Sequence, residues 1–436
     1  MGVDGKYGNV VSAPAIAHAR TIRSIAVVGA GPAGLMAAEV LSSLGYRVVV
    51  FDRMASVGRK LLMAGRGGLN LTHSEPIEPF LLRYGPASSA IKEAIQRFSP
   101  SSLVSWCEDL GQETFIGSSG RVFPKSFKSS PLLRAWLVRL NNAGVEIRPR
   151  HTWTGWDAHG ALSFKGHDGI GVTFAPDAVV LALGGASWPR LGSDGRWVGV
   201  LEKAGVPVAP LVASNCGVRV AWTPLMKSRH CGEPLKRIAV SLGDEIKRGE
   251  AVITQDGLEG NVIYALSGAI RARLDQGQSA NLSIDLRPDE NHEQLKVRLS
   301  GFRGRQSMAT FLRKALKLSP AAISLLHEAT GGPLPADQME RAQLIKAVPV
   351  RVEGLAGLER AISSSGGVEL AALDQNFMLR ARPGVFLAGE MLDWDAPTGG
   401  YLLQACCATG VAAARGIEDW LKQQGDTAAQ TCDARP

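Results

Sequence analysis

A glycine-rich turn near the start of the chain constrains the fold more than any other feature. Gly29, Gly31 and Gly34 form the pattern GxGxxG between an apolar run, Ser24–Val28, and an alanine-rich run, Leu35–Leu44. The first glycine permits a tight turn, the second lets a pyrophosphate approach the backbone, and the third lets helix and strand pack closely. The pattern predicts a strand, a phosphate-binding turn, and a helix whose N-terminus faces the phosphates.

A second strand and an acidic residue complete this unit. The run Arg47–Phe51 is apolar and β-branched, and Asp52 follows it 18 residues after Gly34. A carboxylate at this place can accept hydrogen bonds from the adenosine ribose, and its charge disfavours a 2′-phosphate. The sequence therefore predicts an α/β chain with a Rossmann-like dinucleotide-binding domain.

Two further glycine clusters bear on which dinucleotide is bound. The first, 58–70, directly follows the acidic strand end, and its backbone amides, with Arg59 and Lys60, suit phosphates or an anionic flavin. The second, 387–401, combines a strand, Glu390 and a helix opened by glycines. There Glu390 could bond a ribityl chain, and the helix N-terminus would stabilise the negative charge of a reduced flavin. The predicted cofactor is FAD.

The hydrophobic pattern of the remaining sequence divides the chain into domains. Buried strands are expected at Ala178–Leu183 and Gly384–Ala388, and a last long helix from about Gly400 to Lys422. Between them an antiparallel β pattern gives way to helical spacing, which indicates an insertion. We predict flexible tails at 1–22 and 424–436, a discontinuous FAD-binding domain at 23–204 and 350–423, an inserted β domain at 205–290, and an inserted helical domain at 291–349.

Seven blocks follow one another along the chain: VVGAGPAGLMAA (27–38), GRKLLMAGRGGLNLTHSE (58–75), GRVFPKSFKSSPLLRAW (120–136), LALGGASWPRLGSDG (181–195), ITQDGLEG (253–260), SGGVEL (365–370) and LAGEMLDWDAPTGGYLLQACCATG (387–410). They resemble the BaiN/RdsA-like NAD(P)/FAD-dependent flavoproteins, whose FAD domain is like that of glutathione reductase. The resemblance implies a tightly held FAD, a redox role, and a β-barrel-like insertion followed by a small helical one. Some members are linked to reduction of conjugated enones in steroid-like compounds.

Motifs and resemblance together give the candidate cofactor-binding residues. They are Gly29, Gly31, Pro32, Ala33, Gly34, Asp52, Arg53, Arg59, Lys60, Asn70, Thr72, Gly184, Gly185, Gly389, Glu390, Thr398, Gly399, Gly400 and Tyr401. The chain departs from the family pattern at one place, because Gly68 and Leu69 stand where Arg and Cys usually do. A substrate therefore does not transfer from relatives.

Disulfide-reductase chemistry is excluded by the cysteines. Segment 56–75 contains no cysteine, and Cys406 and Cys407 are neighbours on a predicted helix that cannot bridge without strain. No second strand-GxGxxG-helix unit is present, since the glycines of 166–171 lie between hairpin-like strands. NAD(P)H, if it is the transient electron donor, would reach the flavin through a cleft.

Reduction of a C=C bond also needs a proton donor. Tyr401, Asp395, Tyr264, Lys125 and Arg190 lie in or near the motif blocks, and none of them is assigned as the catalytic acid. The histidines and cysteines show no metal-ligand spacing, so no metal is predicted.

The overall charge favours a small-molecule substrate over a polynucleotide. The net charge is +8, but no run of Lys and Arg is longer than two residues. The longest uncharged run contains glycines and a proline, which argues against a membrane span, and we expect a cytoplasmic protein. Two alternatives stay open: a flavin-dependent RNA-modifying enzyme, and a flavin-binding redox sensor that docks a partner.

Overall fold

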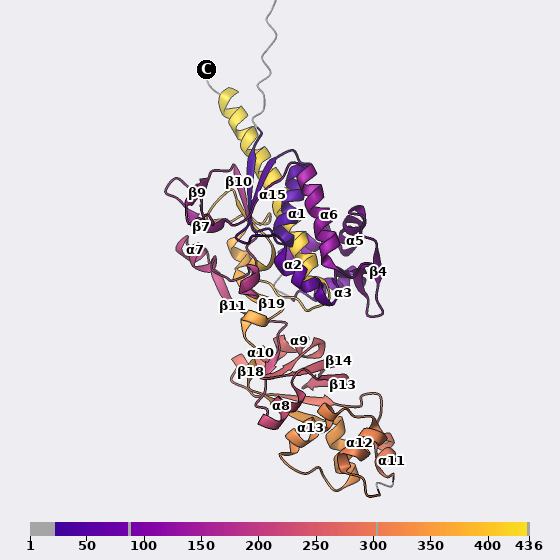
Figure 1. Ribbon diagram of the computed structural model, residues 1–436. Coiled ribbons are helices and arrows are strands. Elements are labelled where there is room, and N and C mark those ends of the chain that lie inside the picture. Colours follow the sequence, from indigo (N-terminus) through magenta and orange to yellow (C-terminus); the bar gives the residue numbers. More distant parts are fainter. Residues whose placement is uncertain (1–21, 86–88, 302–303, 434–436) are drawn as a thin grey trace, which may run out of the picture.

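The computed structural model describes residues 22–85, 89–301 and 304–433, so the predicted N-terminal tail lies outside the described residues except for Ile22. The chain forms two lobes, each built on its own apolar core (Figure 1). Residues from both ends of the sequence build the first core, and residues 218–352 supply the second.

A parallel sheet lies at the centre of the first lobe. Its strands stand in the order β20-β10-β1-β2-β6, and every neighbouring pair is parallel. Both faces of such a sheet are covered, so its strands are almost continuously apolar, as the sequence predicts. The strands are β1 (Ser24–Val28), β2 (Arg47–Phe51), β6 (Glu146–Arg148), β10 (Ala178–Leu181) and β20 (Val385–Leu387).

Two helices from opposite ends of the chain pack side by side in this lobe. They are α1 (Pro32–Ser43) and α15 (Tyr401–Asp433) (Figure 1). A Cβ atom at Gly410 of α15 would lie 2.4 Å from the carbonyl oxygen of Ala33, so only glycine permits this approach. Helix α15 runs well past Lys422 through most of the segment expected to be a loose tail. That segment has one glycine and no proline before its last residue, so little in it ends a helix.

Shorter elements surround the parallel sheet. Gly166 and Gly169 lie in the turn between β8 and β9, and Gly171 begins β9, which confirms the predicted hairpin. The helices are α2 (Arg59–Ala64), α3 (Ile77–Leu82), α4 (Ser89–Arg97), α5 (Pro100–Asp109), α6 (Ser129–Asn142) and α7 (Val198–Lys203). The strands are β3 (Thr72–His73), β4 (Thr114–Ile116), β5 (Arg121–Pro124), β7 (Thr152–Trp156), β8 (Leu162–Lys165), β9 (Gly171–Phe174), β11 (Val208–Ser214) and β19 (Ser363–Val368).

The second lobe contains a seven-stranded sheet in the order β17-β16-β13-β14-β15-β12-β18. Only Glu353 separates β17 from β18, although they form opposite edges of the sheet. The sheet must therefore curl until its edges almost meet, which confirms the barrel-like insertion. The strands are β12 (Val218–Arg219), β13 (Pro234–Leu242), β14 (Glu245–Thr254), β15 (Gly257–Glu259), β16 (Ala280–Asp285), β17 (Val348–Val352) and β18 (Gly354–Leu355).

The helices of this lobe include four that the sequence predicts, α11 to α14. Each begins after a residue whose side chain accepts a backbone hydrogen bond, namely Asn291, Ser307, Ser319 and Asp337. Three others lie inside the segment expected to be β structure. The helices are α8 (Pro224–His230), α9 (Asn261–Tyr264), α10 (Ser267–Asp275), α11 (His292–Leu299), α12 (Met308–Leu316), α13 (Pro320–Thr330) and α14 (Gln338–Lys346).

The strand pairings place chain segments differently from the predicted boundaries. Residues 350–355, expected in the FAD-binding domain, pair within the sheet of the second lobe. Strand β11, expected in the insertion, pairs instead with β19. The alternation of Val348, Val350 and Val352 explains the first difference, because these side chains are buried in the second core. In the described part of the chain, no helix is long and apolar enough to cross a membrane.

Candidate functional site: a dinucleotide cleft

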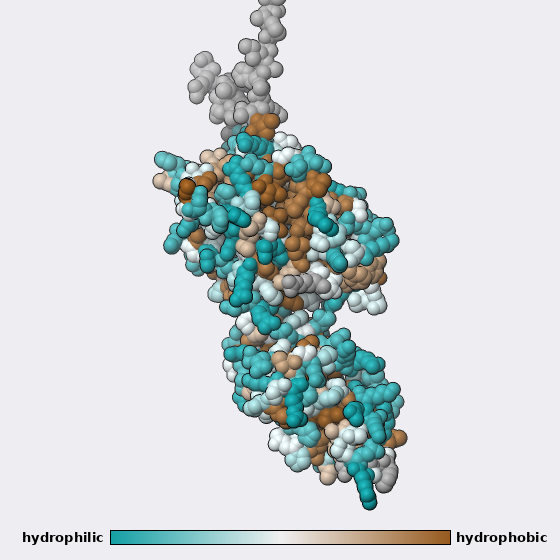
Figure 2. All heavy atoms as spheres, in the orientation of Figure 1, coloured by the Kyte–Doolittle hydropathy of each residue, from teal (hydrophilic) through white to brown (hydrophobic). Residues whose placement is uncertain are grey.

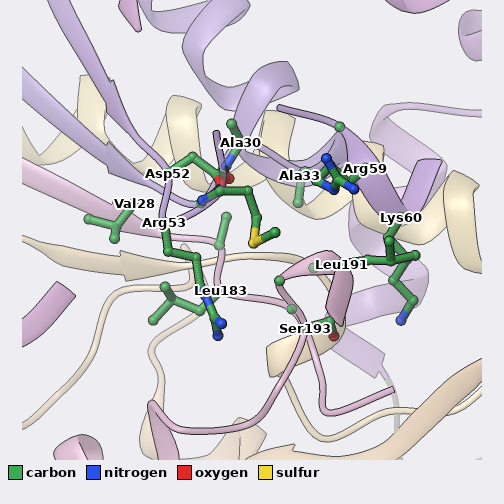
Figure 3. A pocket seen from close by; sticks show the side chains of 18 of the residues that line it. Val28, Ala30, Ala33, Asp52, Arg53, Arg59, Lys60, Leu183, Leu191 and Ser193 are labelled. Carbon is green, nitrogen blue, oxygen red and sulfur yellow. Dashed lines mark hydrogen bonds between the residues drawn. The ribbon is translucent and has the colours of Figure 1, made fainter. Parts of the chain in front are cut away.

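A cleft opens at the carboxyl ends of the central strands of the parallel sheet. Helix α1 carries the chain from β1 to β2 on one side, while β10 and β20 lie on the other side, so β1 marks a topological switch point. Figure 3 shows Asp52 and Arg53 on one side of the cleft, and Arg59 and Lys60 on the other, with Ala33 between them. Ligands of open α/β sheets bind at such places.

The three motif glycines have different structural roles. Gly29 has φ +105°, and a Cβ atom there would lie 2.2 Å from the carbonyl oxygen of Ala182. A Cβ atom at Gly34 would lie 1.9 Å from the carbonyl oxygen of Gly29. At Gly31 a Cβ atom would meet nothing within 4 Å, although this residue lines the cleft. Protein packing thus requires the first and third glycines, and the second leaves space where a ligand can approach the backbone.

Asp52 fastens the glycine turn to the end of β2. Its Oδ2 accepts the backbone amide of Ala30 at 2.8 Å, and its Oδ1 accepts that of Met54 at 2.7 Å. Burial raises the pKa of Asp52, and the two amide hydrogen bonds partly oppose this shift. Arg53, which follows it, forms an ion pair with Asp194. The carboxylate expected to face a ribose therefore also holds the turn in shape.

A half-buried ion pair closes the other end of the cleft. Lys60 Nζ lies 2.6 Å from Glu390 Oε2 and donates to Ser187 Oγ at 2.6 Å. Glu390 Oε1 accepts the backbone amide of Ser364 at 2.9 Å. The side chains of Lys60 and Glu390 are 26% and 12% exposed, so the pair is largely shielded from solvent. Four distant segments of the chain meet here.

Unpartnered polar atoms in the cleft fit a polar cofactor. Five buried side-chain N or O atoms have no hydrogen-bond partner among the described residues, and three of them belong to residues that line the cleft. They are Arg59 Nε, Trp153 Nε1 and Ser193 Oγ. Buried polar atoms normally have partners. Together with the open space at Gly31, they match a ligand that carries phosphates and hydroxyls.

Eleven of the nineteen predicted residues line this cleft, and the other eight lie outside its lining. Gly400 has φ +96°, and a Cβ atom there would lie 2.5 Å from Thr72 Cα, so the start of α15 is pressed against β3. Thr72 is fully buried and donates to Gln404, whereas Asn70 Oδ1 has no partner among the described residues. The eight are Gly34, Asn70, Thr72, Gly185, Thr398, Gly399, Gly400 and Tyr401.

The candidate acids do not converge on one point. Tyr401 donates its hydroxyl to Glu75 at 2.5 Å, and burial raises its pKa. Lys125 forms an exposed ion pair with Glu113 at the end of β5. Arg190 lies in a short 3-10 helix, Pro189–Leu191, outside the cleft lining.

Asp395 and Tyr264 line a second cavity of about 410 Å³ between the two lobes. Asp395 accepts hydrogen bonds from Ser214 and from Arg271, which lies in α10 of the second lobe. Asp393 lines the same cavity, and its carboxyl has no hydrogen bond or ion pair to a described side chain. Burial raises the pKa of Asp393, and the nearby carboxylates Glu369 and Asp395 raise it further.

Sequence reasoning missed several residues of these cavities. Ser193 and Asp194 stand in a quoted motif block without a predicted role, and Trp153 lies in a hairpin that carries no motif. Cys406 also lines the cleft, but burial raises its pKa to about 12. Its thiol therefore stays protonated near neutral pH and is a weak nucleophile. No cluster of three metal-ligating side chains occurs within residues 22–433 where they are described.

Comparison with known proteins shows the family. Residues 23–416 match the family described as HI0933-like protein Rossmann domain. The chain is 27% identical over 411 residues to 3-dehydro-bile acid delta(4,6)-reductase of Clostridium scindens, covering 90% of this chain and 98% of that one. It is 23% identical over 423 residues to ribosomal RNA dihydrouridine synthase of Haemophilus influenzae, covering 90% and 97%.

A solved structure resembles the fold at low identity. It is 3-ketosteroid-delta4-(5alpha)-dehydrogenase from Rhodococcus jostii RHA1 in complex with 4-androstene-3,17-dione, at 16% identity and a TM-score of 0.48, covering 94% of this chain and 99% of that one. The family match over most of the chain confirms the resemblance drawn from the motifs. The chain belongs to the HI0933-like family of FAD-dependent Rossmann oxidoreductases, the BaiN/RdsA group.

Proposed function

We propose that this enzyme reduces a C=C bond conjugated to a carbonyl in a small organic substrate, with NAD(P)H as the electron donor. One observation carries the proposal: relatives aligned over nearly their whole length differ in substrate but share one reaction chemistry. A 3-dehydro-delta(4,6) steroid contains a conjugated enone, and dihydrouridine is uridine with the bond next to its C4 carbonyl saturated. Both reactions add hydride to one carbon and a proton to its neighbour.

The eleven predicted residues that line the cleft would hold FAD. Its phosphates would lie over Gly31 and the N-terminus of α1, where amides and the helix dipole favour negative charge. Lys60 and Glu390 would contact the ribityl chain, and the N-terminus of α15 would face the pyrimidine edge of the flavin. FAD, when bound, supplies a hydride acceptor and donor.

Asp393 is our proposed proton donor. A hydride added to the β-carbon of an enone leaves negative charge on the carbonyl side, and a proton must reach the α-carbon. Asp393 lines the cavity between the lobes, and its pKa is raised, so its carboxyl retains a proton more readily than an exposed aspartate does. Tyr401 is a weaker candidate, because its hydroxyl proton is already donated to Glu75.

Anaerobic titration of the flavin-loaded protein with NADH and then NADPH, followed by a panel of cyclic enones, tests the proposal. We expect the visible flavin absorption to bleach with a nicotinamide and to return on addition of an enone. Asp393→Asn should lower turnover and remove the decline of turnover that the wild type shows as pH rises through the pKa of Asp393. Tyr401→Phe should retain turnover. A flavin that no nicotinamide reduces, or that no enone reoxidises, would refute the proposed reaction.

The second candidate substrate is a uracil base within RNA. The full-length matches to ribosomal RNA dihydrouridine synthases of Haemophilus influenzae and Escherichia coli, at 23% and 24% identity, favour it. A uridine-containing ribosomal RNA fragment is therefore included in the acceptor panel, with dihydrouridine measured by mass spectrometry. Absence of any acceptor turnover would instead favour a flavin-binding redox sensor.

A further inference from the structure

The second lobe carries a cavity whose chemistry the cofactor cleft does not use. The cavity is about 580 Å³ and lies between β13, the end of β16 and helices α11 to α13. Five cationic side chains line it: Lys236, Arg237, Arg287, Arg298 and Lys317. Figure 1 shows β13 and helices α11 to α13 in the lobe away from α1, and no residue lines both the cavity and the cleft.

Most of these cations have no carboxylate partner. Among the described residues, the side chains of Lys236, Arg237 and Lys317 form no hydrogen bond or ion pair. The lining contains three acidic residues, each with a partner of its own: Glu290 binds Arg298, Asp289 binds an arginine of β14, and Glu233 lies 3.2 Å from a histidine of α8. Positive charge in the cavity is therefore largely uncompensated.

Two guanidinium groups are held in place by the end of a helix. Arg287 donates to the carbonyl oxygen of Leu316 at 2.7 Å, and Arg298 donates to that of Ala315. These carbonyls end α12, where the helix dipole stabilises cations. Burial lowers the pKa of Arg287; the carboxylate of Glu290 opposes this shift, whereas the nearby Arg298 and Arg237 lower it further. The guanidinium groups of Arg298 and Arg237 thus lie close enough to that of Arg287 to repel it.

Two of the cationic residues without a side-chain partner, Arg237 and Lys317, have a strained backbone conformation. Arg237 has φ +52° and lies where the β13–β14 pairing shifts register between Leu235 and Ile238. Lys317 has φ +53° at the C-terminal end of α12. Bulky residues seldom adopt positive φ, and bulges commonly redirect a side chain toward a functional site.

The sequence concentrates charge at the same place. Residues 294–327 contain seven Lys and Arg residues and no Asp or Glu. Hydrophilic side chains cover much of the visible face of the second lobe (Figure 2). A cluster of guanidinium groups with free N–H donors matches the geometry and charge of phosphate oxygens.

We propose that this cavity binds phosphate groups, independently of the flavin reaction. The phosphate could belong to a free pyrophosphate-type ligand or to the backbone of a polynucleotide, and the chemistry of recognition is the same. Arg237 and Lys236 would contact the phosphate directly. Arg287 and Arg298, which the carbonyl oxygens of α12 hold in place, would add fixed positive charge beneath it.

Binding to the FAD-loaded protein tests this directly, with inorganic pyrophosphate by calorimetry and a labelled RNA hairpin by fluorescence anisotropy. We expect saturable binding of at least one probe. Binding of the RNA hairpin should weaken with salt, with a slope of log K against log salt of about 0.7 to 0.9 per phosphate contact. Arg237→Glu should weaken it at least tenfold. Lys236→Glu serves as a second variant should the first fold poorly, judged by flavin content and circular dichroism.

Arg229→Glu is the matched control, because Arg229 is an exposed cation of the same lobe outside the cavity. It should change affinity less than twofold. Binding of pyrophosphate alone identifies a free phosphate ligand, and binding of RNA alone identifies a backbone phosphate; either supports the proposal. Two results overturn it: neither probe binds saturably, or Arg237→Glu and Arg229→Glu weaken binding equally.

Discussion

Substituting the second and third motif glycines by alanine should have opposite effects on folding and on cofactor binding. At Gly34 the new methyl would lie 1.9 Å from the carbonyl oxygen of Gly29, which is backbone and must shift by more than 1 Å to reach van der Waals contact. Overpacking of this kind costs about 1–3 kcal/mol. We therefore expect Gly34→Ala to lower the free energy of unfolding by at least that amount.

Gly31→Ala should leave the apoprotein almost unchanged. Gly31 has φ −84°, which alanine adopts freely, and its Cβ atom would meet nothing within 4 Å. Alanine is a poorer N-cap than glycine by about 0.5–1 kcal/mol, but it reduces the entropy of the unfolded chain by a similar amount. The added methyl would, however, occupy the space through which a phosphate reaches the amides of α1. Losing one such charged hydrogen bond costs about 1.5–3 kcal/mol, or roughly 10- to 150-fold in FAD affinity.

Urea unfolding of the apoprotein and titration with FAD, followed by flavin fluorescence, separate the two effects. Gly199→Ala is the control, since Gly199 lies in α7 with no atom within 4 Å of its Cβ position. It should stabilise the protein by about 0.5–1 kcal/mol and leave FAD binding unchanged. Wild-type FAD affinity in Gly31→Ala would refute the placement of the phosphates, and wild-type unfolding of Gly34→Ala would refute the packing argument.

Three further substitutions test individual contacts. Asp52→Asn should lower the free energy of unfolding by about 1–3 kcal/mol, because its NH2 group cannot accept a backbone amide; an unchanged urea midpoint would contradict this. Burial raises the pKa of Glu75, but hydrogen bonds from Arg83 and Tyr401 outweigh it and lower the pKa below its ordinary value of 4.5. The ionised Glu75 carboxylate therefore stabilises the protein above pH 4.5, and this stabilisation is lost as the pH falls. Melting temperatures of wild type and Glu75→Gln, measured from pH 3 to 6, should differ at pH 6 and converge toward pH 3. Lys60→Met should reduce the ratio of flavin to protein absorbance after purification, because it leaves the shielded Glu390 carboxylate without its cation; an unchanged ratio would count against a cofactor role for this pair.

Local signals account for the elements that the sequence predicts well. Strands β1 and β2 and helix α11 have the predicted bounds, because apolar runs, tight turns and capping residues lie within a few residues of one another. Helices α9 and α10 are short and have no side-chain cap at their N-termini, so tertiary packing decides their structure. The extension of α15 past Lys422 was missed because the absence of a stop signal is weaker information than its presence.

Local sequence predicts one part of the candidate site, and tertiary packing alone assembles the other part. The glycine turn and Asp52 follow from a motif, since a strand, a turn and a helix that are contiguous in sequence build that half of the cleft. Ser193 and Trp153 come from distant loops that only the folded sheet brings together. Asp393 was missed for a related reason: its raised pKa depends on burial and on Glu369, which is not its neighbour in sequence.

The order of the central sheet has a consequence for biosynthesis. Strand β10 pairs with β20 through Val179 and Val385, which are 206 residues apart. At about 5–20 residues per second, the ribosome needs roughly 10–40 s to make the chain between them. The whole second lobe therefore leaves the ribosome while the parallel sheet still lacks its last strand and its C-terminal helix. Folding of that lobe can precede completion of the cofactor cleft, and a lobe that folded slowly would leave the edge of β10 exposed to aggregation during synthesis.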